Sequence, residues 1–495
     1  MEYNKSSSQS EPEIKLTKIE ELLMKKDFYK LEEFLARYII YKFGIKYFLL
    51  DNKTSLGFFI PNKEKGYWQE ISEDALAVKI VKTFNTLVNK GTIELLKGDV
   101  RPAISINKVN QVKNYIKGLT GKIITPSNLI SFNNAYLDWQ ELLKGNFDNA
   151  AWLKRYKEIP YVFNHIDYDL DVSTLHALLP NNELLDVEKE KQLIEKELPN
   201  TVNIFKQWVN DNWLLLFEII GYCLIPSYPL HKAFMLYGDG SNGKSTYLLL
   251  VRKILGPQNV SGIPLHSLIE NRFAPANLRN KLANIFPDLP SITLKNTGIF
   301  KALTGEDEIM VDRKFRDFIP LKNYAKLIFS TNRLPITTDL SPAFFDRWIL
   351  VEFPNKFPRT ISNEEFIERN FPANEIEKII TYSILAIYLV LKRGKFSVAG
   401  IDLKEAWLRL SNNVYAFITD MLKEGIIIKD PAGKIKANEL YNMYLSYCEE
   451  NDLEAFNRRK FYEQLENLGY SKYRSGGETY VKGLVKKEEY TVSFA

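Results

Sequence analysis

The chain has 495 residues, of which 45% are hydrophobic and 26% are charged. This length allows two to four domains, and the composition is typical of a globular protein. The formal net charge of +5 is compatible with a nucleic-acid partner but too small to indicate one. Because the sequence has only two cysteines and four scattered histidines, it excludes a disulfide framework and a zinc cluster.

The N-terminal residues 1–13 are polar and lack the apolar core of a signal peptide, so we expect a disordered tail. The stretch Trp213–Leu230 is apolar enough to raise the question of a membrane span. Glu218, Pro226 and Pro229 interrupt it, which makes a buried helix the better interpretation. We therefore expect a cytoplasmic protein with no membrane partner.

Residues 14–200 mix helical and strand periodicity and predict an N-terminal α/β domain. Two short apolar segments, Tyr47–Leu50 and Leu56–Ile60, predict strands, and apolar residues recur at helical spacing in Ala75–Val88. None of these segments carries a chemical motif. Residues 201–232 are strongly apolar with helical spacing and predict a helical collar or linker before the next domain.

The acidic run of residues 165–171 contains Asp167 and Asp169, the kind of paired carboxylates that hold two Mg²⁺ ions in a primase or polymerase. Such a site needs further carboxylates from another strand, and no second acidic strand motif lies nearby. The run instead precedes Val172–Thr174, which looks like a helix start. Acidic residues stabilise the positive end of a helix, so the sequence favours this structural role.

The most informative stretch is GDGSNGKST at residues 238–246. It fits the pattern G-x-x-x-x-G-K-[ST] of a phosphate-binding loop, between an expected strand at Ala233–Tyr237 and an expected helix. Glycines let backbone N–H groups converge on phosphate oxygens, Lys244 would reach the β- and γ-phosphates, and Ser245 would ligate Mg²⁺. The sequence therefore predicts that ATP and Mg²⁺ bind here. The expected nucleotide-binding residues are Gly238, Asp239, Gly240, Ser241, Asn242, Gly243, Lys244, Ser245 and Thr246.

Two later strands each end at a polar residue that a phosphate-loop ATPase could use. An apolar run leads to Asp288, which would hold Mg²⁺ or polarise the attacking water, and another leads to Asn332, which could orient that water. Arg347 precedes a third strand. It could contact the γ-phosphate bound to a neighbouring subunit, or it could be a structural arginine paired with Asp346.

Residues 309–318 alternate like a β-hairpin with a basic tip formed by Arg313, Lys314 and Arg316. One interpretation is a loop that contacts DNA. The other is a solvated hairpin edge, because lysine and arginine also protect exposed strands from pairing.

The order of these elements resembles that of the superfamily 3 helicases, which are AAA+ motors of viruses, phages and plasmids. The resemblance covers Phe234 to about Phe353 and is greatest to the phage and plasmid primase-helicases related to the poxvirus primase-helicase. It implies an AAA+ domain over residues 233–400, with Asp288 as the second acid, Asn332 as the sensor and Arg347 as a finger acting in trans. It also implies that Lys314, with Arg313 and Arg316, grips DNA in a central channel.

Two features depart from this family pattern. Many members carry two adjacent acids or a glutamate where this chain has the single Asp288. The identity of the group that activates the attacking water is therefore an open question. No primase motif stands out in residues 14–200, and a primase would then be a separate protein.

Residues 401–495 predict a winged-helix domain of three helices and a hairpin around Gly476-Gly477. The expected helices are Leu403–Leu422, Ile435–Asn451 and Asn457–Leu468. The tail also contains many glutamates, so binding to DNA and binding to a protein stay equally open. The basic residues expected to contact DNA phosphates are Arg458, Arg459 and Lys460, with Lys472, Arg474 and Lys482.

Taken together, the sequence predicts an α/β protein that acts as a replicative DNA helicase of a virus or plasmid in the cytoplasm of its host. We expect it to work as a ring, a hexamer, on single-stranded and forked DNA. A DNA-packaging or remodelling ATPase, and an origin-binding initiator with an ATP switch, are the alternatives.

Overall fold

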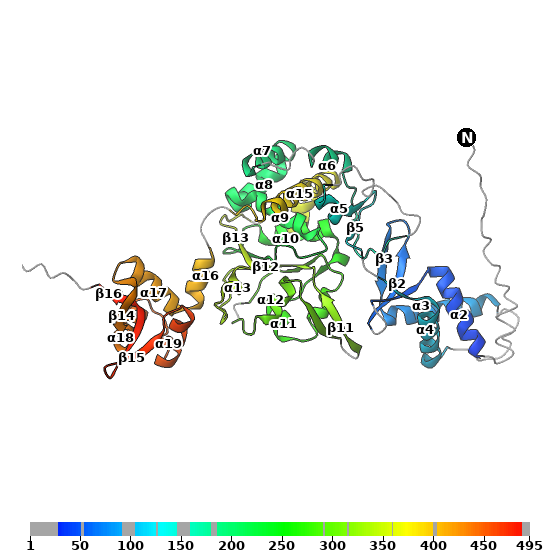
Figure 1. Cartoon of the computed structure of the whole chain (residues 1–495). Coiled ribbons are helices and arrows are strands. Elements are labelled where there is room, and N and C mark those ends of the chain that lie inside the picture. Colours follow the sequence, from blue (N-terminus) through cyan, green and yellow to red (C-terminus); the bar gives the residue numbers. More distant parts are fainter. Residues whose placement is uncertain are drawn as a thin grey trace, which may run out of the picture. The chain divides into compact units, whose positions relative to one another are not determined.

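The computed structural model describes residues 28–50, 54–91, 104–124, 127–145, 159–179, 186–290, 293–313, 316–358, 360–398 and 403–487. These residues fall into two compact units, one within Met1–Asn181 and Phe315–Pro320 and the other within Asn182–Lys314 and Leu321–Ala495 (Figure 1). The expected tail at residues 1–13 lies outside the described residues. Within the described residues, no helix is long and apolar enough to cross a membrane.

The first unit is a mixed α/β structure, as the sequence predicts. A sheet of order β3-β2-β1-β4 packs with three helices around a core that contains Ile39, Phe58 and Ile80. The predicted strands Tyr47–Leu50 and Leu56–Ile60 correspond to β1 and β2. The elements are α2 (Phe28–Phe43), β1 (Lys46–Leu49), β2 (Ser55–Asn62), β3 (Tyr67–Ile71), α3 (Glu73–Gly91), α4 (Ile106–Thr120) and β4 (Gly121–Ile123).

The acidic run lies in the second part of this unit and has the structural role that the sequence favours. Asp167 forms an ion pair with Lys65, with 2.7 Å between its Oδ1 and Nζ, and Asp171 caps the next helix by accepting from the Thr174 N–H at 2.9 Å. The described residues contain no group of three or more His, Cys, Asp or Glu side chains suited to a metal ion. The elements here are β5 (Leu129–Ser131), β6 (Tyr136–Asp138), α5 (Trp139–Leu143) and α6 (Val172–Leu178).

The second unit contains a parallel five-stranded sheet of order β13-β7-β12-β9-β8. Its strands are buried on both faces, which explains their continuous apolar sequences. In Figure 1, α9, α10 and α15 lie above this sheet, and α11 and α12 lie below it. The strands are β7 (Ala233–Tyr237), β8 (Val260–Ser261), β9 (Ala283–Phe286), β12 (Lys326–Thr331) and β13 (Trp348–Glu352).

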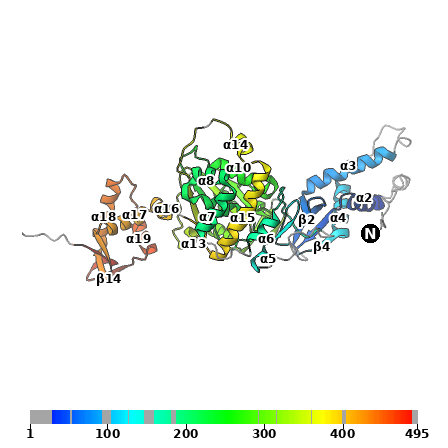
Figure 2. The same ribbon diagram turned by 90° about the horizontal axis from the view of Figure 1, so that it is seen from above.

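A layer of helices covers one face of this sheet, and Figure 2 shows it from above. Helices α8 and α9 correspond to the apolar helical segment expected within residues 201–232, whereas α14 and α15 were not anticipated. The hairpin predicted at residues 309–318 is present as β10 and β11. The bounds are α7 (Val187–Glu197), α8 (Pro199–Val209), α9 (Trp213–Cys223), α10 (Lys244–Leu255), α11 (Leu265–Glu270), α12 (Gly298–Thr304), β10 (Glu308–Arg313), β11 (Arg316–Lys322), α13 (Pro342–Phe345), α14 (Asn363–Asn370) and α15 (Ala373–Arg393).

The C-terminal part has its own hydrophobic core and a three-stranded sheet of order β14-β16-β15. Two predictions about it were wrong. The expected helix Leu403–Leu422 is two helices, because Asn412 accepts from the Val414 and Tyr415 N–H groups and caps the second one. A strand, β14, precedes the next helix. The elements are α16 (Leu403–Ser411), α17 (Asn413–Lys423), β14 (Ile427–Lys436), α18 (Ala437–Glu450), α19 (Arg458–Asn467), β15 (Lys472–Ser475) and β16 (Glu478–Lys486).

One buried cluster of charges connects three helices of the second unit. The Arg393 guanidinium on α15 donates to Glu190 of α7 and, at 2.8 Å, to Glu218 of α9, and both carboxylates are fully buried. Burial raises the pKa of Glu190 to about 8 and that of Glu218 to about 7, although Arg393 opposes both shifts. The two acids share this guanidinium as their ion-pair partner, and Glu218 also accepts from the Ser397 N–H at 3.0 Å.

We predict that Arg393→Met destabilises the chain by about 3 kcal/mol at pH 8, because it leaves two buried carboxylates without their cation. The loss should shrink at pH 5, since protonation of Glu190 and Glu218 removes the uncompensated charge. Urea-induced unfolding at both pH values measures the effect. Lys189→Met is the control, because its pair with Asp186 is exposed and should contribute less than about 1 kcal/mol. An equal loss at both pH values would contradict the explanation.

Candidate functional site

The predicted phosphate loop connects β7 to α10 with the backbone geometry that such a loop needs. Gly240 and Gly243 have φ values of 98° and 92°, a region that favours glycine. Gly243 is the N-cap of α10 and provides no side-chain cap, so the first N–H groups of the helix are available to a ligand. The loop therefore ends at a helix N-terminus without a side-chain cap, a position that favours negative charge.

The Lys244 side chain is 95% buried yet has no carboxylate partner among the described residues. Its Nζ donates to the Gly238 carbonyl oxygen at 2.5 Å, to Asn242 Oδ1 at 3.0 Å and to Asn332 Oδ1 at 3.1 Å. Burial lowers the Lys244 pKa, and the more distant Asp239 and Asp288 oppose the shift. An ammonium surrounded by neutral oxygens is suited to receive an anionic ligand.

Asp288 and Asn332 reach the same edge of the sheet as the loop, because the carboxyl ends of parallel strands lie together. In the sheet, Thr331 of β12 pairs with Tyr237 of β7, so Asn332 follows beside Gly238. The Asp288 N–H donates to Ser330 Oγ at 3.3 Å, and Asp288 has a φ of 63°. A positive φ is uncommon outside glycine and is often found at functional sites.

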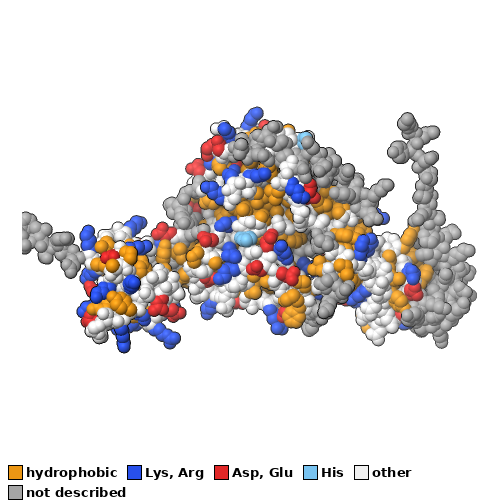
Figure 3. Space-filling model, in the orientation of Figure 1, with side chains coloured by type: hydrophobic (Ala, Val, Ile, Leu, Met, Phe, Trp, Pro, Cys, Tyr) orange, Lys and Arg blue, Asp and Glu red, His pale blue; other side chains and the backbone are white. Residues whose placement is uncertain are grey.

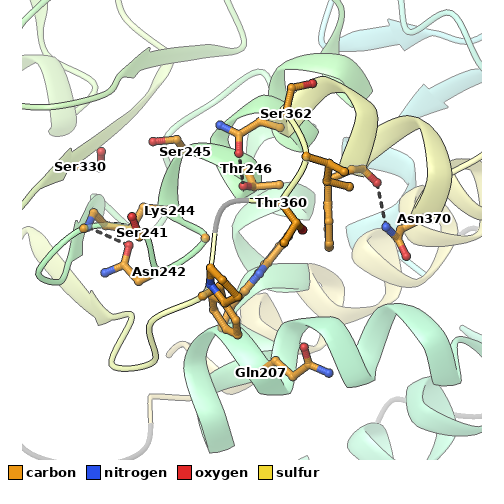
Figure 4. Close-up of a pocket in the computed structure, with 18 of the residues that line it drawn as sticks. Gln207, Ser241, Asn242, Lys244, Ser245, Thr246, Ser330, Thr360, Ser362 and Asn370 are labelled. Carbon is orange, nitrogen blue, oxygen red and sulfur yellow. Dashed lines mark hydrogen bonds between the residues drawn. The ribbon is translucent and has the colours of Figure 1, made fainter.

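These residues line a cavity of about 700 Å³, which is in the size range of small-molecule sites. Figure 4 shows Lys244, Ser245 and Ser330 on one side of it and Gln207 and Asn370 on the others. Of the residues predicted to bind nucleotide or metal, Gly240 through Thr246, Asp288 and Asn332 line the cavity. Gly238 and Asp239 lie outside its lining, and Asp239 forms an ion pair with Lys356 at 3.7 Å.

The rest of the cavity wall comes from segments in which the sequence carries no motif. The segment after β13 crosses the loop, where the Phe357 N–H donates to the Ser241 carbonyl oxygen at 2.7 Å, and Thr246 Oγ1 bonds to Asn363 Oδ1 at 2.8 Å. The wall residues that sequence reasoning missed are Gln207, Trp208, Phe357, Pro358, Thr360, Ile361, Ser362, Asn363, Phe366, Arg369 and Asn370.

Trp208 of α8 packs directly against the phosphate loop. A Cβ added to Gly243 would lie 2.5 Å from Trp208 Cδ1 and 2.6 Å from Nε1, so only glycine fits between them. The same indole contacts Tyr247 of α10 and Phe366 of α14, with ring centroids 6.3 and 6.2 Å apart. The Trp208 side chain therefore connects α8 to the loop, to α10 and to α14.

Arg347 lies at the opposite edge of the sheet from the cavity. Its carbonyl oxygen accepts from the Ala233 N–H at 2.6 Å, at the start of β7, whereas the loop follows the end of that strand. Five strand residues separate the two edges by about 17 Å. The Arg347 guanidinium donates to the Ala343 carbonyl oxygen, and its buried Nε has no hydrogen-bond partner. Arg347 cannot contact a ligand in the cavity of its own chain.

The residues expected to contact DNA lie elsewhere. Arg313 ends β10, Arg316 begins β11, and Lys314 lies outside the described residues. Arg458, Arg459 and Lys460 form the first turn of α19. Arg458 donates to Asn438 Oδ1 at 3.0 Å, and Lys460 Nζ lies 3.9 Å from the centre of the Phe456 ring. Arg458 and Lys460 therefore contact side chains of their own domain.

Comparison with known proteins gives two family matches. Residues 409–491 match the family described as "Poxvirus D5 protein-like", and residues 236–347 match a family of unknown function, DUF5906. Over residues 409–491, the chain is thus similar to a family of viral primase-helicase proteins. This finding confirms the resemblance drawn from the motifs. No curated protein matches the sequence.

Similar solved structures include two apo structures of the NrS-1 C-terminal region. The first, an A-form structure, has 14% identity and a TM-score of 0.46, covering 92% of this chain and 98% of that one. The second has 12% identity and a TM-score of 0.42, with coverage of 92% and 99%. The JCV helicase has 15% identity and a TM-score of 0.21, covering 51% of this chain and 78% of that one.

We predict that Gly243→Ala destabilises the chain more than Gly240→Ala. Both glycines have a positive φ, so both substitutions strain the backbone by about 1–2 kcal/mol. Only the new Cβ at residue 243 meets the Trp208 indole, because a Cβ at residue 240 has nothing within 4 Å. Thermal unfolding of the two variants separates the clash from the strain. Equal melting temperatures would show that Trp208 does not constrain the loop.

Proposed function

We propose that the protein is an ATP-dependent replicative DNA helicase of a virus or plasmid. The observation that carries this proposal is the buried Lys244 ammonium, which faces only neutral oxygens inside a cavity that Asp288 and Asn332 also line. A triphosphate would supply the missing negative charge. The loop N–H groups and the α10 N-terminus would bind its phosphates.

The residues present also fit a Mg²⁺ ion. Mg²⁺ in nucleotide sites uses one or two protein oxygens, with phosphates and water completing its octahedral shell. Ser245 and Asp288 both line the cavity and supply a hydroxyl and a carboxylate. The ion would neutralise phosphate charge, and Asn332 would orient the attacking water. Asp288 would either polarise the attacking water or bind the Mg²⁺ ion through a bridging water molecule.

Hydrolysis would require a second copy of the chain, because Arg347 lies about 17 Å from its own loop. In a closed ring, Arg347 of one subunit would stabilise the charge that develops on the γ-phosphate bound to the next. The core would then be an AAA+ motor, and a hexamer is the expected ring. The β10–β11 hairpin with Arg313, Lys314 and Arg316 would contact single-stranded DNA in the channel.

The C-terminal elements support a winged-helix domain. α18 and α19 precede the β15–β16 hairpin, and the basic first turn of α19 would contact phosphates of the DNA. A packaging or remodelling ATPase would share the core but would not separate strands, so unwinding of a forked duplex distinguishes it. An origin-binding initiator would show little turnover stimulated by DNA.

We predict that Lys244→Ala abolishes ATP hydrolysis and the unwinding of forked DNA together, because the variant lacks the charge that binds the phosphates. Steady-state phosphate release and a strand-separation assay measure the two activities. Lys253→Ala is the matched control, since Lys253 lies in the last turn of the same helix, about 13 Å along its axis. Unwinding that survives Lys244→Ala would end the proposal.

We predict that Arg347→Ala lowers the rate of hydrolysis by about 10³-fold or more while ATP still binds. Asp288→Ala should also be inactive. In a mixture of the two variants, some interfaces pair an intact Asp288 with an intact Arg347, so part of the activity should return. Phosphate release from the mixture at constant total protein tests this. If mixing restores nothing, Arg347 has a structural role within its own chain.

A further inference from the structure

The outward face of the C-terminal sheet is an aromatic and basic surface, which we call the wing face. Ile435 of β14 and Val481 of β16 point into the core, so the residues beside them in each strand point outward. Lys472 of β15 pairs with Val481 on the inner face, where its Nζ lies 4.4 Å from the centre of the Tyr462 ring. The wing face consists of Lys434, Lys436, Tyr473, Glu478, Tyr480 and Lys482.

Two tyrosines form the centre of the wing face. Tyr473 and Tyr480 are direct cross-strand partners, and their ring centroids lie 5.9 Å apart with an angle of 31° between the planes. Tyr473 is 38% exposed and lies on β15, the edge strand of this sheet. In the part of the chain that the structure describes, no further strand of the sheet covers the outer side of the Tyr473 ring. A flat ligand could therefore extend the ring pair.

The charges on the wing face favour an anion. Lys434 and Lys482 are directly opposite each other in the β14–β16 ladder, and like charges in this position are destabilising unless an anion compensates them. The single acid of the face, Glu478, already bonds to Lys436 and to the Tyr480 hydroxyl, each at 2.9 Å. Lys434 Nζ lies 4.7 Å from the centre of the Tyr480 ring, which places positive charge beside the aromatic pair.

The wing face can recognise a ligand in two ways, because its tyrosine rings can stack and its lysines can bind phosphates. Unpaired bases use both, because their faces are open and their phosphates are close by. Base pairs inside a duplex hide their faces from the tyrosine rings. An acidic peptide would use Lys434 and Lys482 but would leave Tyr473 without a stacking partner. In the view of Figure 3, Lys and Arg side chains project beside hydrophobic ones on the C-terminal part of the chain.

We infer that the wing face binds single-stranded nucleic acid. An unpaired base stacks on the open side of Tyr473, and the neighbouring phosphates contact Lys434 and Lys482. This site is separate from the channel hairpin and from α19, and it needs no ATP hydrolysis. It would hold an unpaired strand outside the motor.

Photocrosslinking of the full chain tests this inference with a residue-level readout. The probes are single-stranded oligonucleotides of 5-iodo-2′-deoxyuridine, the corresponding 5-iodouridine RNA, and a blunt duplex of the same length. Mass spectrometry of the crosslinked peptides should find Tyr473 or Tyr480 with a single-stranded probe and not with the duplex. Comparison of the DNA and RNA probes identifies which strand is preferred. Crosslinks that are confined to other segments would overturn the inference.

Variants separate stacking from charge. Tyr473→Ala should lower the yield of crosslinks within residues 472–486 at least about five-fold, because base–aromatic stacking is lost. Tyr473→Phe keeps the ring and should preserve the yield, and Tyr41→Ala, an exposed tyrosine of α2, should have no effect. Equal losses in the Ala and Phe variants would refute stacking. The Lys244→Ala chain should crosslink normally, so failure of the helicase proposal and failure of this inference are distinguishable.

Discussion

The candidate site depends on one electrostatic arrangement, an ammonium group held among neutral oxygens at the carboxyl edge of a parallel sheet. Gly238, Asn242 and Asn332 supply those oxygens, and they come from the loop after β7 and from the end of the neighbouring strand β12. Parallel pairing makes this convergence possible, because it brings the ends of β7, β9 and β12 to one edge. The buried sheet thus positions every residue of the proposed phosphate chemistry.

The same sheet geometry places Arg347 at the far edge, beside the start of β7. The separation follows from the length of the strands and does not depend on any side-chain conformation. It explains why the proposed chemistry divides between two copies of the chain. In the proposed ring, one subunit would bind ATP, and its neighbour would supply Arg347 for hydrolysis.

Much of this site could be predicted from the sequence, because its residues follow buried strands. Continuous apolar runs ending at Tyr237, Phe286 and Thr331 identified the strands, and the glycine pattern identified the loop. The distances around Lys244 could not be predicted, since they depend on which strands are neighbours. That order is a tertiary property.

The missed parts have other physical causes. The wall of the cavity comes from α8 and α14, whose residues meet only in the folded chain, and apolar spacing alone does not show which surface they face. Strand β14 was missed because Asp430-Pro431-Ala432-Gly433 reads as a turn, and the β14–β16 register does shift between Lys429 and Lys434. The break at Asn412 was overlooked, although asparagine is a strong helix cap.

The Trp208 contact has a thermodynamic consequence. Since the indole lies against Gly243, the geometry that the loop has in this structure depends on the position of α8. Any molecule that binds the loop in its native form must stabilise the packing of α8 by the same free energy. A ligand at the loop end of the cavity should therefore slow amide hydrogen exchange in α8, a helix that ends 29 residues before the loop begins.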